Sequence, residues 1–145
     1  MKKKVLFVCS SNVCRSAVAA AILIEYGHTR YDVSSAGINA PSGEPMHSEC
    51  ADALEMLFGH GYSAYNHTST RLSWKHLRDA DVVVAVSEGH ARFLRENFKE
   101  YADKVISFPE PVPSIVYLRD SSMQKAVKGI RNQVFKMFLE DADEI

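Results

Sequence analysis

The chain has 145 residues and a net charge of −1, with 17 basic against 18 acidic side chains. A charge balance this even argues against nucleic acid as the main partner, because it leaves no broad basic excess. The basic segment at residues 1–4 precedes only four apolar residues, too few for a signal-peptide core or a membrane span. We therefore expect a cytoplasmic protein with neither a nucleic-acid nor a membrane partner.

This length, with an apolar content of 46%, predicts one domain over residues 1–145 with a substantial core. Three cysteines, an odd number, do not make a disulfide scaffold, so reduced thiols are expected. The chain contains no internal repeat, low-complexity run or linker.

Strand and helix patterns alternate along the chain. Apolar runs predict strands at residues 4–9, 31–35, 81–86 and 104–108, and helices are expected at 16–27, 47–60, 73–79, 87–100 and 121–140. Short connections between them predict right-handed crossovers and a parallel sheet in an α/β fold. In such sheets ligands bind beyond the carboxyl ends of the strands.

Local signals predict where helices end and which faces pack. Ser16 is the expected N-cap of the first helix, and Gly27 its C-terminal stop. In the last helix, Ser121 and Gln124 form a capping-box pattern. Trp74 is expected to pack in the core. Apolar residues at helical spacing also predict core packing for Met123, Ala126, Val127, Ile130, Val134, Met137 and Phe138.

The segment between the first strand and the first helix carries a cysteine with an arginine six positions later, Cys9 and Arg15. A loop before a helix N-terminus directs backbone N–H groups into one concavity, where the helix dipole adds partial positive charge. This environment favours the thiolate, which is the nucleophilic form of cysteine. Arg15 can hold two oxygens of a tetrahedral oxyanion, and Ser16 can donate its hydroxyl to the sulfur. The pattern predicts attack of sulfur on a phosphoryl group.

Residues 8–16, Val-Cys-Ser-Ser-Asn-Val-Cys-Arg-Ser, resemble the active-site loop of the low-molecular-weight protein tyrosine phosphatases, V-C-x-G-N-x-C-R-S. The likeness extends to Ser-Ala-Gly at 35–37, Asn-His at 66–67 and Asp-Ala-Asp-Val-Val-Val-Ala-Val at 79–86. The resemblance implies a three-layer αβα fold with a four-stranded parallel sheet in the order 2-1-3-4. It also implies a phosphoric monoester hydrolase that needs no cofactor.

The same resemblance assigns roles to the loop. Cys9 is the nucleophile that forms a phosphocysteine intermediate. Asn12 braces the loop, and Ser35 and His67 match positions that hydrogen-bond to this asparagine. Asparagine tolerates the left-handed backbone angles that a tight anion cradle needs. The phosphoryl group is held by loop residues and their backbone N–H groups: Ser10, Ser11, Asn12, Val13, Cys14, Arg15 and Ser16.

A leaving alcohol needs a proton from a general acid. In the family this acid is the aspartate of a D-P turn after the fourth strand, and the corresponding residue here is Glu110. Glu110 would later act as the base for the water that clears the intermediate. Since glutamate is one methylene longer, activity is expected to be reduced. An exposed glutamate without a catalytic role is the alternative.

Two further departures from the family pattern concern the loop and its surroundings. Ser11 replaces the loop glycine, which would strain the backbone by roughly 1 kcal/mol if that position needs a positive φ. The loop at residues 38–46 is expected to line one wall of the active-site mouth. The mouth has few aromatic side chains, because the counterparts of the family's bulky residues are Ser10, Pro41, Val112 and Pro113.

The substrate therefore stays open at this point. Val13 occupies a position that is often aliphatic in tyrosine-selective members and threonine in arginine phosphatases, which favours phosphotyrosine. The non-aromatic walls offer an aromatic ring less to stack on, so phosphotyrosine, phosphoarginine and a small ester all stay open. The expected partner is a phosphorylated protein or a small aryl phosphate, with inorganic phosphate as the product.

The cysteines other than Cys9 decide whether a disulfide, a metal site or an arsenate reductase is expected. Cys14 either forms a reversible disulfide with Cys9 or is a small buried residue. His47 and Cys50 lack a second pair with zinc spacing, so no metal is expected. An arsenate reductase needs a distal cysteine pair, and only Cys50 lies beyond the loop. An inactive phosphate-binding relative is the other alternative, and a P-loop nucleotidase is excluded by its missing motif.

Overall fold

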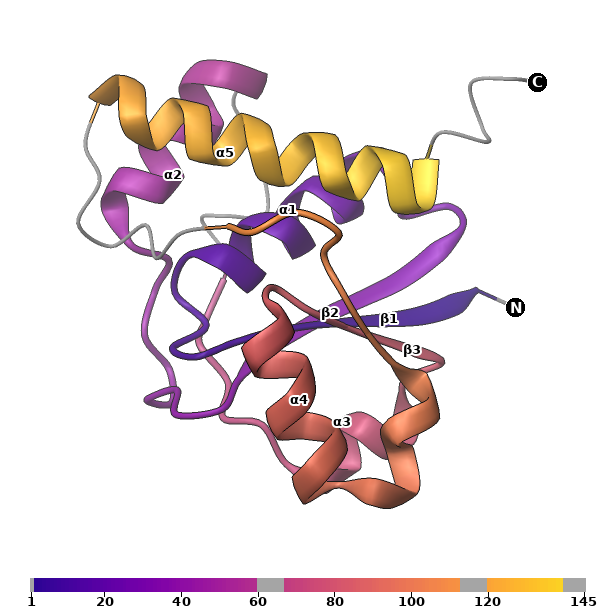
Figure 1. Cartoon of the computed structure of the whole chain (residues 1–145). Helices are drawn as coiled ribbons and strands as arrows, with labels where there is room; N and C mark the ends of the chain where they lie inside the picture. Colours follow the sequence, from indigo (N-terminus) through magenta and orange to yellow (C-terminus); the bar gives the residue numbers. More distant parts are fainter. Residues whose placement is uncertain (1, 60–66, 113–119, 140–145) are drawn as a thin grey trace.

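The computed structural model describes residues 2–59, 67–112 and 120–139 (Figure 1). Two residues used above, Asn66 and Pro113, lie outside these ranges. The side chains of Phe58, Asp120 and Ser121 are likewise outside the description.

Four parallel strands form the centre of the molecule: β1 (Lys3–Cys9), β2 (Tyr31–Gly37), β3 (Val82–Ala85) and β4 (Val105–Ser107). Their order in the sheet is β2-β1-β3-β4, as predicted. β1 is an inner strand and is buried from Val5 to Cys9. Its continuous apolar run follows from this position, because both faces of a parallel sheet are covered by helices.

Helices cover the two faces of the sheet, which makes the predicted three layers (Figure 1). Helices α1 (Arg15–Gly27), α2 (Ser48–Phe58) and α5 (Asp120–Val134) lie on one side, and α3 (Trp74–Asp79) and α4 (Glu88–Asn97) lie on the other. Side chains alternate along β1: Phe7 packs in the cluster under α1 and α5, and Leu6 and Val8 pack in the opposite one. A 3₁₀ helix (Lys99–Lys104) precedes β4, and a π-helical segment (Phe135–Leu139) continues α5.

The first helix ends at Gly27, as predicted, but begins one residue earlier than expected. It begins at Arg15, so Ser16 is not the N-cap, and the hydroxyl of Ser16 contacts Cys9 and Asn12 instead. Gly27 is the last helical residue, but it is no left-handed stop. A Cβ at this glycine would lie 2.9 Å from Leu23 Cδ1, so close packing explains the glycine there.

Two other local predictions need correction. Helix α5 begins at Asp120, one residue before the expected cap at Ser121. Trp74 is 49% exposed and does not pack in the core. Its ring instead lies under the guanidinium of Arg78, with 5.0 Å between the guanidinium carbon and the ring centroid.

The apolar stripe of α5 packs as predicted. Met123, Val127, Ile130 and Val134 are buried, and Ala126, Met137 and Phe138 pack against the same cluster. Within the described ranges, no helix is both long and apolar enough to cross a membrane.

Candidate active site

The centre of the site is the Cys9 thiol, at the carboxyl end of β1. Its sulfur lies 2.8 Å from Ser16 Oγ, and the backbone N–H of Asn12 donates to it at 3.2 Å. Cys9 is only 2% exposed. Hydrogen bonds from an N–H and a hydroxyl stabilise a sulfur that carries negative charge. The strand end, the loop and the first turn of α1 thus surround one thiol with two hydrogen-bonding groups.

Asn12 holds the loop in shape. Its carboxamide Nδ2 donates to Ser16 Oγ and to Ser35 Oγ, both at 2.9 Å, while its Oδ1 accepts the backbone N–H of Thr70 at 2.9 Å. Nε2 of His67 lies 2.6 Å from the backbone oxygen of Asn12. Asn12 is completely buried, so these contacts satisfy its polar groups. The residues that the resemblance assigned to loop support therefore lie together.

The loop backbone turns at Asn12, where φ is +58°. Among the described residues this is the one position other than glycine with a positive φ, so Ser11 does not carry the strain considered for it. The backbone of this loop also lies very close to the end of β2. A Cβ on Gly37, at the end of β2, would lie 2.6 Å from the carbonyl oxygen of Ser10. Because Gly37 has no side chain, the end of β2 can pack directly against the loop backbone.

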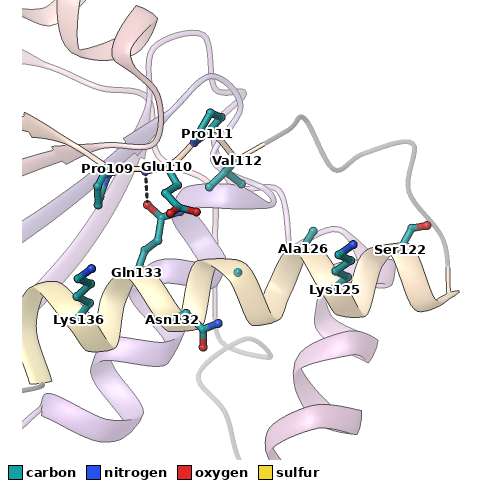
Figure 2. Close-up of a pocket in the computed structure, with 11 residues that line it drawn as sticks. Pro109, Glu110, Pro111, Val112, Ser122, Lys125, Ala126, Asn132, Gln133 and Lys136 are labelled. Atoms are coloured by element: carbon teal, nitrogen blue, oxygen red, sulfur yellow. Dashed lines mark hydrogen bonds between the residues drawn. The ribbon is translucent and has the colours of Figure 1, made fainter.

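Arg15, the first residue of α1, links the loop to the segment after β4. Its Nη1 donates to the carbonyl oxygen of Val112 at 3.5 Å, a long contact. Glu110 lies two residues before Val112 and is exposed. Its backbone N–H donates to Gln133 Oε1 of α5 at 2.9 Å (Figure 2). The segment that carries the predicted acid therefore contacts Arg15 through Val112 and α5 through Glu110.

The carboxylate of Glu110 lies in a cavity of about 560 Å³ between this segment and α5 (Figure 2). In the view of Figure 2 the carboxylate extends toward α5, on the side where Gln133 rises from the helix. Lys125 and Lys136 also line this cavity. The structure thus places Glu110 next to the segment that contacts Arg15, with its carboxylate in the adjoining cavity.

The loop at residues 38–46 directly follows β2. The N–H groups of Ile38 and Asn39 donate to the carbonyl oxygens of Cys9 and Ser10, both at 2.9 Å. This pairing places the beginning of the loop against the cysteine end of the site. Pro41 is exposed, whereas Val112 is buried. That these two residues form walls of the site stays a prediction.

His90 of α4 belongs to the site and was not singled out from the sequence. Its Nε2 lies 2.8 Å from Ser10 Oγ, and its Nδ1 lies 2.5 Å from the hydroxyl of Ser87. Burial and the nearby charge of Arg15 lower the pKa of His90, which favours the neutral imidazole. The available signal was the Ser-x2-His spacing directly after β3, where the carboxyl-end rule places ligand-binding residues.

The cysteines differ from the prediction. Cys14 forms a disulfide with Cys50 of α2, and Cys9 is the free thiol. In this state Cys14 is buried, as one of the two alternatives expected, and its partner is Cys50 and not Cys9. The expected set of reduced thiols is wrong for this state. The physical reason is the position of α2. Its beginning is held to the loop by a hydrogen bond from the N–H of His47 to the carbonyl oxygen of Val13, 2.8 Å long.

His47 is the third member of this group. One of its ring nitrogens lies within 4.8 Å of the sulfur atoms of Cys14 and Cys50, and its Nδ1 is buried without a hydrogen-bond partner. Two sulfurs and an imidazole nitrogen are ligands that zinc accepts. In the disulfide, both sulfurs are already bonded to each other, so this state offers a metal only the imidazole.

Comparison with known proteins places the chain in a family. Residues 4–117 match the family model described as low molecular weight phosphotyrosine protein phosphatase. A protein-arginine-phosphatase from Bacillus subtilis is 34% identical over 112 residues, which is 74% of this chain and 71% of that protein. The low molecular weight protein-tyrosine-phosphatase Wzb from Salmonella typhi is 31% identical over 108 residues, 74% of this chain and 70% of that one.

Solved structures agree. The low molecular weight protein tyrosine phosphatase from T. tengcongensis has a TM-score of 0.89 at 27% identity and covers 96% of this chain and 99% of its own. The YwlE arginine phosphatase from Geobacillus stearothermophilus has a TM-score of 0.88 at 25% identity, with coverages of 98% and 94%. The family match together with these relatives shows that this chain is a phosphatase and belongs to the low-molecular-weight phosphotyrosine protein phosphatase family.

Proposed function

We propose that this phosphatase hydrolyses phosphotyrosyl protein through a phosphocysteine intermediate on Cys9. The observation that carries the proposal is the position of the Cys9 sulfur, which accepts the backbone N–H of Asn12 and lies 2.8 Å from Ser16 Oγ, at the start of the loop that precedes α1. In the reaction the sulfur attacks phosphorus and the phenolic oxygen leaves. The guanidinium of Arg15 and the loop N–H groups hold the equatorial oxygens as charge spreads over them.

The leaving oxygen needs a proton, and Glu110 is the proposed donor. Its support is its place in the segment that contacts Arg15 through Val112. For catalysis the carboxylate has to turn from the cavity on α5 toward the phosphoryl group, a side-chain rotation open to an exposed glutamate. Once the alcohol has left, the same carboxylate takes a proton from the water that attacks phosphocysteine, which releases inorganic phosphate and the free thiol.

The relatives and Val13 support the proposed substrate class. The relatives include phosphatases named for tyrosine and for arginine, so phosphoprotein is the common feature. Val13 favours phosphotyrosine within that class. Phosphoarginine is the second candidate, because a protein-arginine-phosphatase is 34% identical to this chain. The proposed compartment is the cytoplasm.

The test compares wild type, Cys9→Ser and Glu110→Gln on a phosphotyrosyl peptide and on the matching phosphoarginyl peptide, across pH. We expect turnover of the phosphotyrosyl peptide, its complete loss in Cys9→Ser and a fall of roughly 10²-fold in Glu110→Gln. Unchanged turnover in Glu110→Gln would remove Glu110 from the mechanism but keep Cys9. Faster turnover of the phosphoarginyl peptide would mean that phosphoarginine, and not phosphotyrosine, is the substrate. Phosphate binding without any turnover in the wild type would indicate an inactive relative.

A further inference from the structure

The disulfide between Cys14 and Cys50 lies directly behind the active-site loop. Cys14 is a loop residue between Asn12 and Arg15, while Cys50 belongs to α2. The two side chains are 4% and 0% exposed. Both are therefore about as buried as Cys9, which is 2% exposed. Cys9 lies at a site that must admit a phosphoryl group, so a smaller peroxide can enter there.

The reduced protein would keep the sulfurs of Cys14 and Cys50 close together. The hydrogen bond from the N–H of His47 to the carbonyl oxygen of Val13 holds the beginning of α2 to the loop without the disulfide. Cys50 also packs against Met123 of α5, with 4.0 Å between their sulfur atoms. Cys14 shares its loop with Cys9 on one side and contacts Cys50 on the other. It can therefore exchange bonds with either.

We propose that Cys50 completes a three-cysteine relay that moves oxidation away from Cys9, so that one encounter with a peroxide leaves the phosphatase with a free nucleophile and a Cys14–Cys50 disulfide. For a protein expected in the cytoplasm this fits general experience, since disulfides there are usually transient and catalytic or redox-sensing. The relay rests on Cys9 as the reactive thiol of the proposed function.

The relay consists of the oxidation of Cys9 and two successive thiol exchanges. The thiolate of Cys9 attacks one peroxide oxygen, the O–O bond breaks, and a sulfenic acid forms as water leaves. The thiolate of Cys14 then attacks the Cys9 sulfur, the S–O bond breaks, and a second water leaves. The thiolate of Cys50 next attacks the Cys14 sulfur and displaces the Cys9 thiolate. Overall, the thiols of Cys14 and Cys50 lose two electrons and two protons, and hydrogen peroxide becomes two waters.

His47 has a role in the last step. One of its ring nitrogens lies within 4.8 Å of both sulfurs, and its buried Nδ1 has no hydrogen-bond partner. When Cys50 is a thiol, the imidazole of His47 accepts its proton and generates the attacking thiolate. An ordinary thiol is only a few per cent thiolate at pH 7, so loss of this base is expected to slow the exchange roughly tenfold. His47 is thus a positioning and proton-accepting residue for Cys50.

The experiment starts from fully reduced wild type, which is desalted and given one equivalent of hydrogen peroxide. Thiols are trapped at intervals, disulfides are mapped by mass spectrometry, and hydrolysis of an aryl phosphate is followed in parallel. We expect a transient Cys9–Cys14 disulfide that gives way to Cys14–Cys50, with activity lost and then regained without reductant. In Cys50→Ala the Cys9–Cys14 disulfide and the inactivation should persist until dithiothreitol is added. His47→Gln should slow only the regain.

Two outcomes would overturn the relay. One is a wild type that remains linked at Cys9–Cys14, as in Cys50→Ala. The other is formation of Cys14–Cys50 in Cys9→Ser at the wild-type rate, because oxidation would then bypass Cys9. Disulfide mapping needs no turnover, so it tests the relay even in a protein that lacks phosphatase activity. Conversely, active wild type with either overturning pattern would leave the proposed function standing.

Discussion

At the scale of single residues, Asn12 shapes the active-site loop through both its backbone and its side chain. The backbone is left-handed, and the carboxamide contacts Ser16, Ser35 and Thr70. An alanine would lose these hydrogen bonds and also hold an unfavourable backbone conformation. A glycine would lose the hydrogen bonds but adopt the backbone without strain.

This pair of effects gives the first prediction. Both Asn12→Ala and Asn12→Gly should lower kcat/KM by roughly 10²-fold, because the loop N–H groups lose their fixed positions. Asn12→Ala should unfold more easily than Asn12→Gly by about 1 kcal/mol, because only alanine carries the left-handed strain. Urea unfolding and aryl phosphate kinetics measure both quantities. Equal stability of the two variants would contradict the prediction, because it would mean that the backbone at position 12 does not strain alanine.

His90 gives a second prediction, on pH. Its pKa in the folded protein lies below the ordinary value of 6.5, through burial and the charge of Arg15. As pH falls through 6.5, the unfolded chain binds a proton at this histidine before the folded protein does. The contribution of His90 to the free energy of unfolding is therefore complete above pH 6.5 and decreases below it.

The matched variant is His90→Asn, which has no titrating side chain. We expect its free energy of unfolding to fall less than that of wild type between pH 7.5 and pH 5.5, whatever its absolute value. Urea unfolding at the two pH values provides the comparison. The same fall in both proteins would mean that other groups account for the acid sensitivity.

At the scale of elements, the end of β2 and the body of α5 respond oppositely to an added methyl group. A Cβ at Gly37 would lie 2.6 Å from Ser10 O and 2.9 Å from Asn12 N, both backbone atoms that cannot move away without distorting the loop. A Cβ at Gly129 in α5 would meet nothing within 4 Å. Glycine inside a helix costs about 1 kcal/mol relative to alanine.

The third prediction follows from this contrast. Gly37→Ala should destabilise the protein by about 1–3 kcal/mol and reduce phosphatase activity, since overpacking displaces the loop. Gly129→Ala should raise the free energy of unfolding by about 0.5–1 kcal/mol and leave activity unchanged. Thermal unfolding and aryl phosphate hydrolysis test both variants. A neutral Gly37→Ala would mean that the loop does not depend on the close approach of β2.

The elements also show where sequence reasoning succeeds. Continuous apolar runs and helical spacing identified β1 and the packing face of α5, because burial on both sides of a strand and along one side of a helix leaves those patterns. Ser16 and Trp74 were misassigned. A serine before a helix favours a cap in general, but here a nearby sulfur and carboxamide take its hydroxyl. An aromatic ring does not by itself reveal that cations cover it at the surface.

At the scale of the whole molecule, the site gathers residues from distant parts of the chain. The resemblance located Cys9 and Arg15 because they lie in one short segment. The contact of His90 with Ser10 spans 80 positions, and the disulfide of Cys14 with Cys50 spans 36. Such pairings depend on how α4 and α2 pack on the sheet, which no local pattern encodes. The sequence did mark the first pair indirectly, through the Ser-x2-His spacing after β3.

The disulfide gives the fourth prediction. It closes a stretch with a sequence separation of 36, and such a link stabilises mainly by restricting the unfolded chain. Reduction should lower the free energy of unfolding by about 3–4 kcal/mol on the chain-entropy estimate. Cys14→Ala can form neither the Cys14–Cys50 nor the Cys9–Cys14 disulfide, so its stability should not depend on reductant, which provides the control. Urea unfolding with and without reductant measures the difference, and an equal midpoint for reduced and oxidised wild type would contradict it.

The central claim is that Cys9 carries the phosphoryl group during turnover. The most direct measurement is rapid acid quench of wild type and Glu110→Gln during aryl phosphate hydrolysis, followed by peptide mapping of the phosphorylated residue. We expect phosphocysteine at Cys9 in wild type, and more of it in Glu110→Gln, where the base that clears the intermediate is missing. Turnover in which Cys9 stays unmodified, or a phosphoryl group on any other residue, would contradict it.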